Sequence, residues 1–167
     1  TCTATVQNDQ VLDQDPPAQP MAADYVWTFT TTTCGGAYTP IHDIQGSGLV
    51  SPINGQPVTT EAVVTAVFQT SPADLNGFFI QAIPGTEDAD PLTSEGVFVY
   101  HNTLAPTVGD IVRVQATVGV YENQTQLTAP SITTTCSSGN ALPAAIALDL
   151  PDVADAAFSL EPYEGML

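Results

Sequence analysis

Short runs of β-branched and aromatic residues follow one another along the chain from Pro40 onward. Each run is rich in Val, Ile, Phe or Thr and is bounded by Gly, Pro, Asn or Asp, a pattern typical of strands separated by turns. The first and fourth runs are long enough to bend and take part in two sheets. The pattern therefore predicts an all-β domain, a five-stranded Greek-key barrel that is closed or partly open. The expected strands span residues 58–69, 77–82, 96–101, 110–121 and 124–135.

The first 33 residues have a separate strand pattern. Residues 2–6 alternate in polarity, and Tyr25, Trp27 and Phe29 fall on one face of a second predicted strand. Two strands and the long polar loop between them cannot bury these aromatic side chains by themselves. We therefore expect this segment to be the end of a β-sandwich whose earlier strands are missing.

Helical periodicity is confined to the C-terminal part of the chain. Asp152 follows a proline and can begin a short C-terminal helix over residues 152–160. Gly35 and Gly36 mark the end of the N-terminal segment. The expected organisation is a detached β segment over 1–34, a linker leading into the barrel over 35–57, and the barrel domain over 58–167.

Composition and charge exclude two function classes. Hydrophobic residues make up 43% of the 167, enough for a core, yet no apolar run reaches the roughly 18 residues that a membrane span needs. The 18 acidic residues and one basic residue, Arg113, give a net charge of −17. Such a chain cannot neutralise a row of phosphates, which excludes nucleic-acid binding through a basic patch. The excess of carboxylates favours solubility in a saline or extracellular setting.

The three cysteines predict one disulfide and one unpaired thiol. Cys34 and Cys136 each follow a run of threonines and precede a loop, and no cysteine has the spacing of a zinc ligand. A disulfide between Cys34 and Cys136 would close a loop over most of the chain and contribute about 4–5 kcal/mol. Cys2 is then left over, and we expect its partner to lie upstream or in another chain.

An acidic run between the second and third expected strands is a candidate cation site. Carboxylates together with Thr93, Ser94 and backbone carbonyls could supply the roughly six to eight oxygens that Ca²⁺ takes, although the spacing is not that of an EF-hand. A solvated hairpin loop explains the same run. His42 lacks a Ser or Cys partner in a catalytic motif, and we expect it to be structural. The candidate Ca²⁺ ligands are Glu87, Asp88, Asp90 and Glu95.

Several separate motifs resemble one family. They are IHDIQGSG (41–48), NGFFIQ (76–81), DPLTSEGVFVY (90–100), VGDIVRV (108–114) and LEPYEGML (160–167). Together they resemble the OB-fold domain of large secreted bacterial endonucleases of the ExeM/NucH type. In these proteins the domain precedes a metal-dependent endonuclease/exonuclease/phosphatase domain, whose catalytic motifs belong to sequence beyond Leu167, so no catalytic residue carries over. YVWTFTT (25–31) resembles the closing strand of bacterial Ig-like domains.

Aromatic residues on the second and third barrel strands are candidates for nucleic-acid binding, because OB-folds stack bases on this face. Phe98 and Tyr100 share one side of a strand, as do Phe79 and Gln81. Core packing is an alternative for Phe79 and Phe98, since the barrel needs large residues inside. Arg113, the remaining candidate, can contact about one phosphate at most, so we expect weak binding that divalent cations bridge.

These observations predict a non-catalytic OB-fold module of an extracellular, multidomain, nuclease-like bacterial protein. The module would position nucleic acid or support a following hydrolase domain of the same polypeptide. One alternative is a structural module that self-associates through residues 1–33 by pairing a strand with another copy. The other is a surface module that binds calcium or carbohydrate, since OB-folds also bind oligosaccharides.

Overall fold

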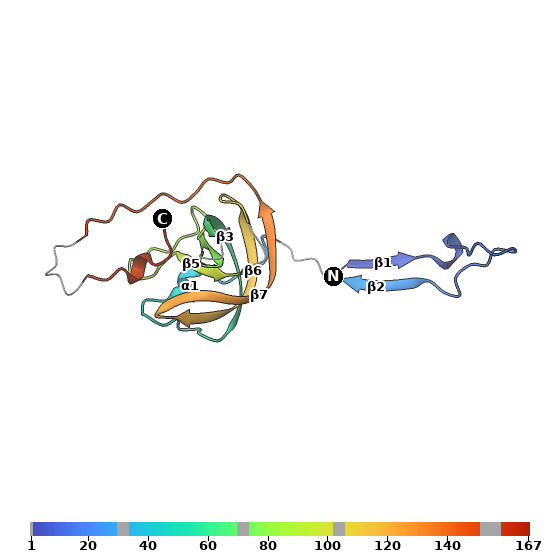
Figure 1. The fold of residues 1–167 in the computed structure, drawn as a ribbon, viewed down its shortest axis with the longest axis horizontal. Helices are drawn as coiled ribbons and strands as arrows, with labels where there is room; N and C mark the ends of the chain where they lie inside the picture. Colours follow the sequence, from blue (N-terminus) through green and yellow to red (C-terminus); the bar gives the residue numbers. More distant parts are fainter. Residues whose placement is uncertain (1, 30–33, 70–73, 102–105, 151–157) are drawn as a thin grey trace. The chain divides into compact units, whose positions relative to one another are not determined.

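The computed structural model describes residues 2–29, 34–69, 74–101, 106–150 and 158–167. The chain forms two compact units, Thr1–Thr33 and Cys34–Leu167. The first unit pairs β1 (Cys2–Val6) with β2 (Tyr25–Phe29) in an antiparallel ribbon, with a 3-10 turn η1 (Asn8–Gln10) between them (Figure 1). No described side chain of residues 2–28 is buried, so these residues form no core among themselves.

The second unit is a closed barrel with the strand order β3-β4-β5-β7-β6. All neighbouring strands are antiparallel except β5 and β7, where Phe98 and Val99 pair in parallel with Gln126 and Leu127. The predicted all-β, OB-fold-like barrel with a detached N-terminal β segment is confirmed. Its strands are β3 (Pro57–Phe68), β4 (Gly77–Gln81), β5 (Gly96–Tyr100), β6 (Ile111–Tyr121) and β7 (Gln124–Ser137).

The first long strand, β3, takes part in both sides of the barrel, as the pattern predicts. Residues 57–63 of β3 pair with β6, while residues 63–68 pair with β4 after a register shift between Val64 and Ala66. A bulge of this kind bends a strand and increases its twist, which lets one strand serve both sides of a barrel.

A short helix that the sequence pattern did not indicate fills one end of the barrel. α1 (Ile41–Gln45) lies in the stretch expected to be a linker, and it buries Ile41 and Ile44 in the same cluster as Phe78 and Leu127. A single turn is too short to show helical periodicity in the sequence, although the spacing of the two isoleucines matches one helix face. The segment over 35–57 is therefore part of the barrel unit.

The C-terminal residues return to the barrel (Figure 1). Only the last part of the predicted helix over 152–160 lies within the described residues, and Phe158–Leu160 is not helical; the short C-terminal helix is the 3-10 turn η2 (Glu161–Tyr163). Gly165 lies so close to Gly96 of β5 that a Cβ on Gly96 would collide with its backbone. The Leu167 amide also donates to Gln81 Oε1 over 3.0 Å.

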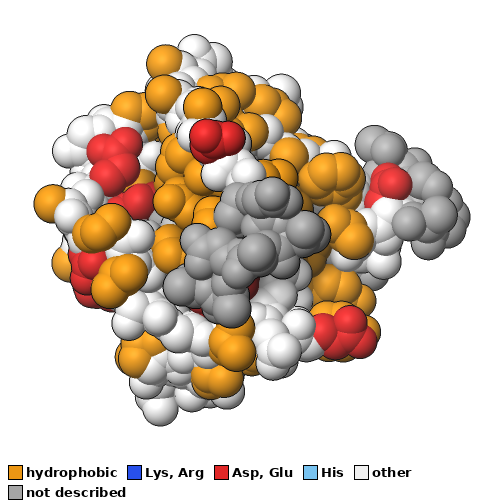
Figure 2. Space-filling model, turned by 90° about the vertical axis from the view of Figure 1, so that its left-hand side faces the viewer, with side chains coloured by type: hydrophobic (Ala, Val, Ile, Leu, Met, Phe, Trp, Pro, Cys, Tyr) orange, Lys and Arg blue, Asp and Glu red, His pale blue; other side chains and the backbone are white. Residues whose placement is uncertain are grey.

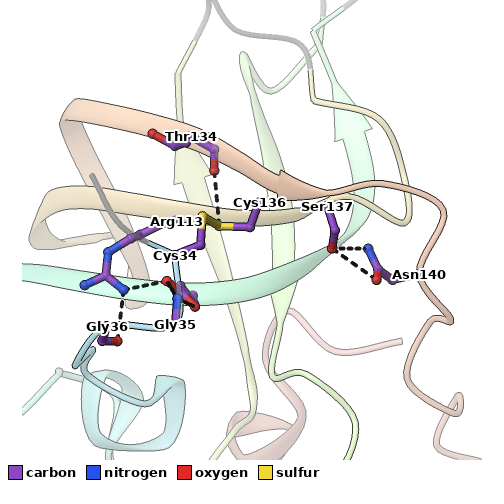
Figure 3. The surroundings of a disulfide bond; sticks show 9 residues. Cys34, Gly35, Gly36, Arg113, Thr134, Cys136, Ser137 and Asn140 are labelled. Carbon is purple, nitrogen blue, oxygen red and sulfur yellow. Dashed lines mark hydrogen bonds and ion pairs between the residues drawn. A yellow bond between two sulfur atoms is a disulfide. The ribbon is translucent and has the colours of Figure 1, made fainter. Parts of the chain in front are cut away.

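The predicted disulfide joins Cys34 to Cys136, and Cys2 is free and exposed. Beside the disulfide lies an ion pair between Arg113 and Glu61, which face each other across β6 and β3 (Figure 3). Both interactions tie the segment after Cys34 to the barrel wall. No helix among the described residues is long and apolar enough to cross a membrane.

Candidate functional site

The predicted nucleic-acid face divides into a covered half and an open half. On β4, Gln81 is buried and Phe79 is half-buried, and both lie beside the C-terminal segment. Leu167 donates its amide to Gln81, while Phe79 lines a shallow hollow with Gly165 and Met166. Phe79 also packs on Phe98, with ring centroids 4.9 Å apart. Gln81 and Phe79 thus face protein rather than solvent over much of their surface.

The β5 half of the face is open. Tyr100 is 47% exposed at the end of β5, whereas Phe98, two residues earlier on the same strand, is buried. A hollow of about 420 Å³ opens here. It is lined by Leu75, Phe98, Tyr100, Tyr121, Gln124 and Gln126. This hollow lies on the third barrel strand and beside the β3–β4 and β6–β7 connections, the place where OB-folds bind oligonucleotides and oligosaccharides.

Four residues of this hollow were not among the predicted site residues: Leu75, Tyr121, Gln124 and Gln126. Tyr121, which is 63% exposed, and Gln124 flank the tight turn between β6 and β7. Glu122 and Asn123 have φ values of 49° and 67°, the left-handed conformations that a two-residue hairpin turn requires. The sequence could have indicated Tyr121, because a tyrosine at a strand end beside a predicted turn is expected to be exposed. Most of the other residues that line the hollow with Tyr121 come from distant parts of the sequence, so only the closed barrel shows that they lie together.

Arg113 is engaged with protein partners on both of its terminal nitrogens. It is only 8% exposed, and its Nη1 lies 2.5 Å from Glu61 Oε1. The two terminal nitrogens also donate to the carbonyls of Gly36 and Ala37 over 3.1 and 2.6 Å. Glu61 in turn accepts the Gly35 amide. The one Lys or Arg side chain of the chain is therefore engaged within the barrel wall.

The structure brings together two of the four predicted metal ligands and adds a histidine. Asp88, Glu95 and His42 each offer a ligand atom, and these atoms lie within 4.8 Å of one another. Glu87 and Asp90 instead use a carboxylate oxygen to accept nearby backbone amides, those of Gly85 and Leu92. His42 comes from α1, so only the fold could join it to the acidic loop.

Glu164 is a further acidic group held by the barrel. Its Oε1 accepts the Thr125 amide over 2.9 Å and the Gln45 side-chain amide over 3.4 Å. Burial raises the pKa of this carboxyl above its ordinary value; the hydrogen bond from Gln45 opposes that shift, and nearby Glu161 adds to it. Glu164 thus links the C-terminal segment to α1 and β7.

The described surface offers no basic patch. On the face shown in Figure 2, acidic side chains lie in separate groups among apolar and neutral ones, and no Lys or Arg side chain is visible among the described residues. A polyanion approaching this surface would meet repulsion unless cations screen it.

Comparisons of the chain with family models, with curated proteins and with solved structures gave no match.

Proposed function

We propose that the barrel is a non-catalytic OB-fold module of a secreted, multidomain, nuclease-like protein, and that it holds a single nucleic-acid strand for a following hydrolase domain. The observation that carries this proposal is the hollow beside Tyr100 and Tyr121, which occupies the ligand-binding position of an OB-fold. The motifs that resemble ExeM/NucH-type endonucleases support the same assignment. The disulfide supports an oxidising, extracellular location.

The chemistry of the hollow suits a base better than a phosphate. Tyr100 and Tyr121 are both exposed and present aromatic rings on which bases can stack. Gln124 and Gln126 add side-chain amides that can donate to and accept from base edges. Specific contacts in this hollow would therefore come from stacking and hydrogen bonding.

Phosphate neutralisation must come from outside the chain. Arg113 is engaged with Glu61, and the net charge is −17. Divalent cations that bridge phosphates and surface carboxylates would supply the missing positive charge. We therefore expect weak binding that depends on Ca²⁺ or Mg²⁺ and is lost in a chelator.

Fluorescence anisotropy with a labelled oligothymidylate tests the proposal. At low salt with Ca²⁺ or Mg²⁺, we expect saturable binding by the full chain, weakened in Tyr100→Ala and Tyr121→Ala by about 1–3 kcal/mol per lost stacking contact. Tyr25→Ala is the matched control, because it removes an exposed tyrosine from the other unit. Binding that is equal in all three variants would contradict the proposal. Displacement by a neutral oligosaccharide would indicate a carbohydrate module instead.

A second candidate function is self-association through the N-terminal unit. Tyr25, Val26 and Trp27 are exposed along β2, and Cys2 offers a free, exposed thiol on β1. Exposed strands of this kind can pair with a sheet edge of another copy of the chain. Light scattering of the full chain under reducing conditions, compared with a chain lacking residues 1–33, tests this. A monomer in both cases contradicts self-association.

A further inference from the structure

We propose that His42, Asp88 and Glu95 bind a divalent transition-metal ion of the Zn²⁺ class, in a site distinct from the Tyr100 hollow. The site joins α1 to the loop between β4 and β5. His42 Nδ1 lies 3.0 Å from Glu95 Oε1 and 3.9 Å from Asp88 Oδ2. Ligand atoms around a tetrahedral Zn²⁺, with bonds of about 2.1 Å, lie about 3.4 Å apart, so these separations bracket those of a metal site.

Glu95 carries the observation that points to a ligand. The residue is only 6% exposed, and its Oε2 is buried with no hydrogen-bond partner among the described residues. Its other oxygen receives both His42 Nδ1 and the Asp88 amide, the latter over 2.8 Å. A buried carboxylate oxygen without a partner is costly, because it has lost its water and gained nothing in return. A bound cation would satisfy it.

Asp88 is held in place by its own neighbours. Both of its carboxylate oxygens accept the Thr93 hydroxyl, and Oδ1 also accepts the Asp90 amide over 3.0 Å. Such contacts orient a ligand before the metal arrives and raise affinity. They also leave Oδ2, the oxygen facing His42, with capacity for a further bond.

Charge and access favour a cation here. Two carboxylates and one imidazole carry an excess of negative charge whether or not His42 is protonated. Asp88 and Glu95 line an open hollow of about 350 Å³ that also includes Glu87 and Asp90, so an ion can enter and keep water ligands.

The donor set distinguishes this site from the oxygen-only Ca²⁺ site that the sequence suggests. Imidazole nitrogen is a favourable ligand for Zn²⁺ and other divalent transition metals, whereas Ca²⁺ takes oxygen ligands. Binding requires a neutral His42 whose Nδ1 lone pair faces the metal, with the proton kept on Nε2. The ion would then take the place of the hydrogen shared by His42 and Glu95.

Thermal denaturation and calorimetric titration of the metal-free full chain test the inference. The Cys2→Ser background removes the free thiol as a competing zinc ligand. We expect one Zn²⁺ per chain and a saturable rise in melting temperature, with affinity about tenfold or more weaker in His42→Ala and in Glu95→Gln. Asp43→Asn and Glu87→Gln are matched controls, because each removes one negative charge near the site without removing a proposed ligand. Both controls should bind Zn²⁺ as the parent does.

Two outcomes would overturn the proposal. Equal stabilisation by Ca²⁺, Mg²⁺ and Zn²⁺ that survives His42→Ala would show non-specific or oxygen-only binding. No Zn²⁺-dependent change in either experiment would show that His42 and Glu95 form only a hydrogen bond. Because no nucleic acid is present in these experiments, either result leaves the proposed function of the Tyr100 hollow untouched.

Discussion

Both units carry aromatic residues on β-strands, but these side chains stay exposed in the N-terminal unit and are partly or fully buried in the barrel. Tyr25 and Trp27 lie two positions apart on β2, and Phe79 and Phe98 are cross-strand neighbours on β4 and β5. Both pairs of rings are in contact, with centroids 5.6 Å and 4.9 Å apart. In the N-terminal ribbon the rings stay exposed, whereas Phe98 is buried. Alternation produces a strand, but a core requires strands that close on one another. The barrel is therefore expected to hold most of the stability of the chain.

The largest effect should come from breaking the disulfide of the barrel. It spans a sequence separation of 102 residues, and removing it with Cys34→Ser/Cys136→Ser should lower the free energy of unfolding of the barrel by about 4–5 kcal/mol. Urea unfolding followed by far-UV circular dichroism measures this loss. Cys2→Ser is the control and should leave the barrel transition unchanged. An equal loss from Cys2→Ser would mean that the N-terminal unit stabilises the barrel.

The next largest loss of stability should come from replacing Arg113. Arg113→Met leaves the Glu61 carboxylate buried without its partner, which should cost about 3–5 kcal/mol in the same urea experiment. The double variant Arg113→Met/Glu61→Gln should recover part of this loss, because no buried charge then remains unpaired. If Arg113→Met unfolds at the same urea concentration as the parent, the ion pair contributes little to the barrel wall.

The N-terminal ribbon should unfold separately and with a small free energy. Trp27 is the single tryptophan of the chain, so its fluorescence reports on this unit alone. An isolated two-stranded ribbon is marginally stable, so the fluorescence transition should occur at lower urea than the circular dichroism transition of the barrel. Trp27→Phe should leave the barrel transition in place. Coincident transitions would show that the two units fold as one.

The smallest effect should be the pH dependence that Glu164 adds. Because its pKa is raised in the folded state, its stabilising contribution is complete below the unfolded pKa of about 4.3 and is lost as the pH rises through the folded pKa. Glu164→Gln keeps an acceptor for the Thr125 amide and does not ionise, so its stability does not fall with rising pH for this reason. The variant should therefore gain melting temperature relative to the parent as the pH rises from about 4 towards neutrality. Parallel melting curves across that range would contradict the raised pKa.

The candidate site was only partly predictable. Tyr100 and Phe98 were expected on one side of their strand because the pleat alternates side chains by sequence position alone. The covering of Gln81 by Leu167 could not be anticipated, since these residues are 86 positions apart and meet only through the path of the C-terminal segment. Asp88 and Glu95 were predicted from a local acidic run, whereas His42 required the placement of α1.

The sequence by itself determined the strands and the net charge, because periodicity, turn residues and composition are local properties. The similar Thr-rich flanks of Cys34 and Cys136 also pointed to their pairing. Tertiary structure alone decided which half of the barrel face stays open, that Arg113 is engaged with Glu61, and that His42 meets Asp88 and Glu95. These outcomes depend on register shifts and barrel closure, in which contacts between distant residues compete for the same space.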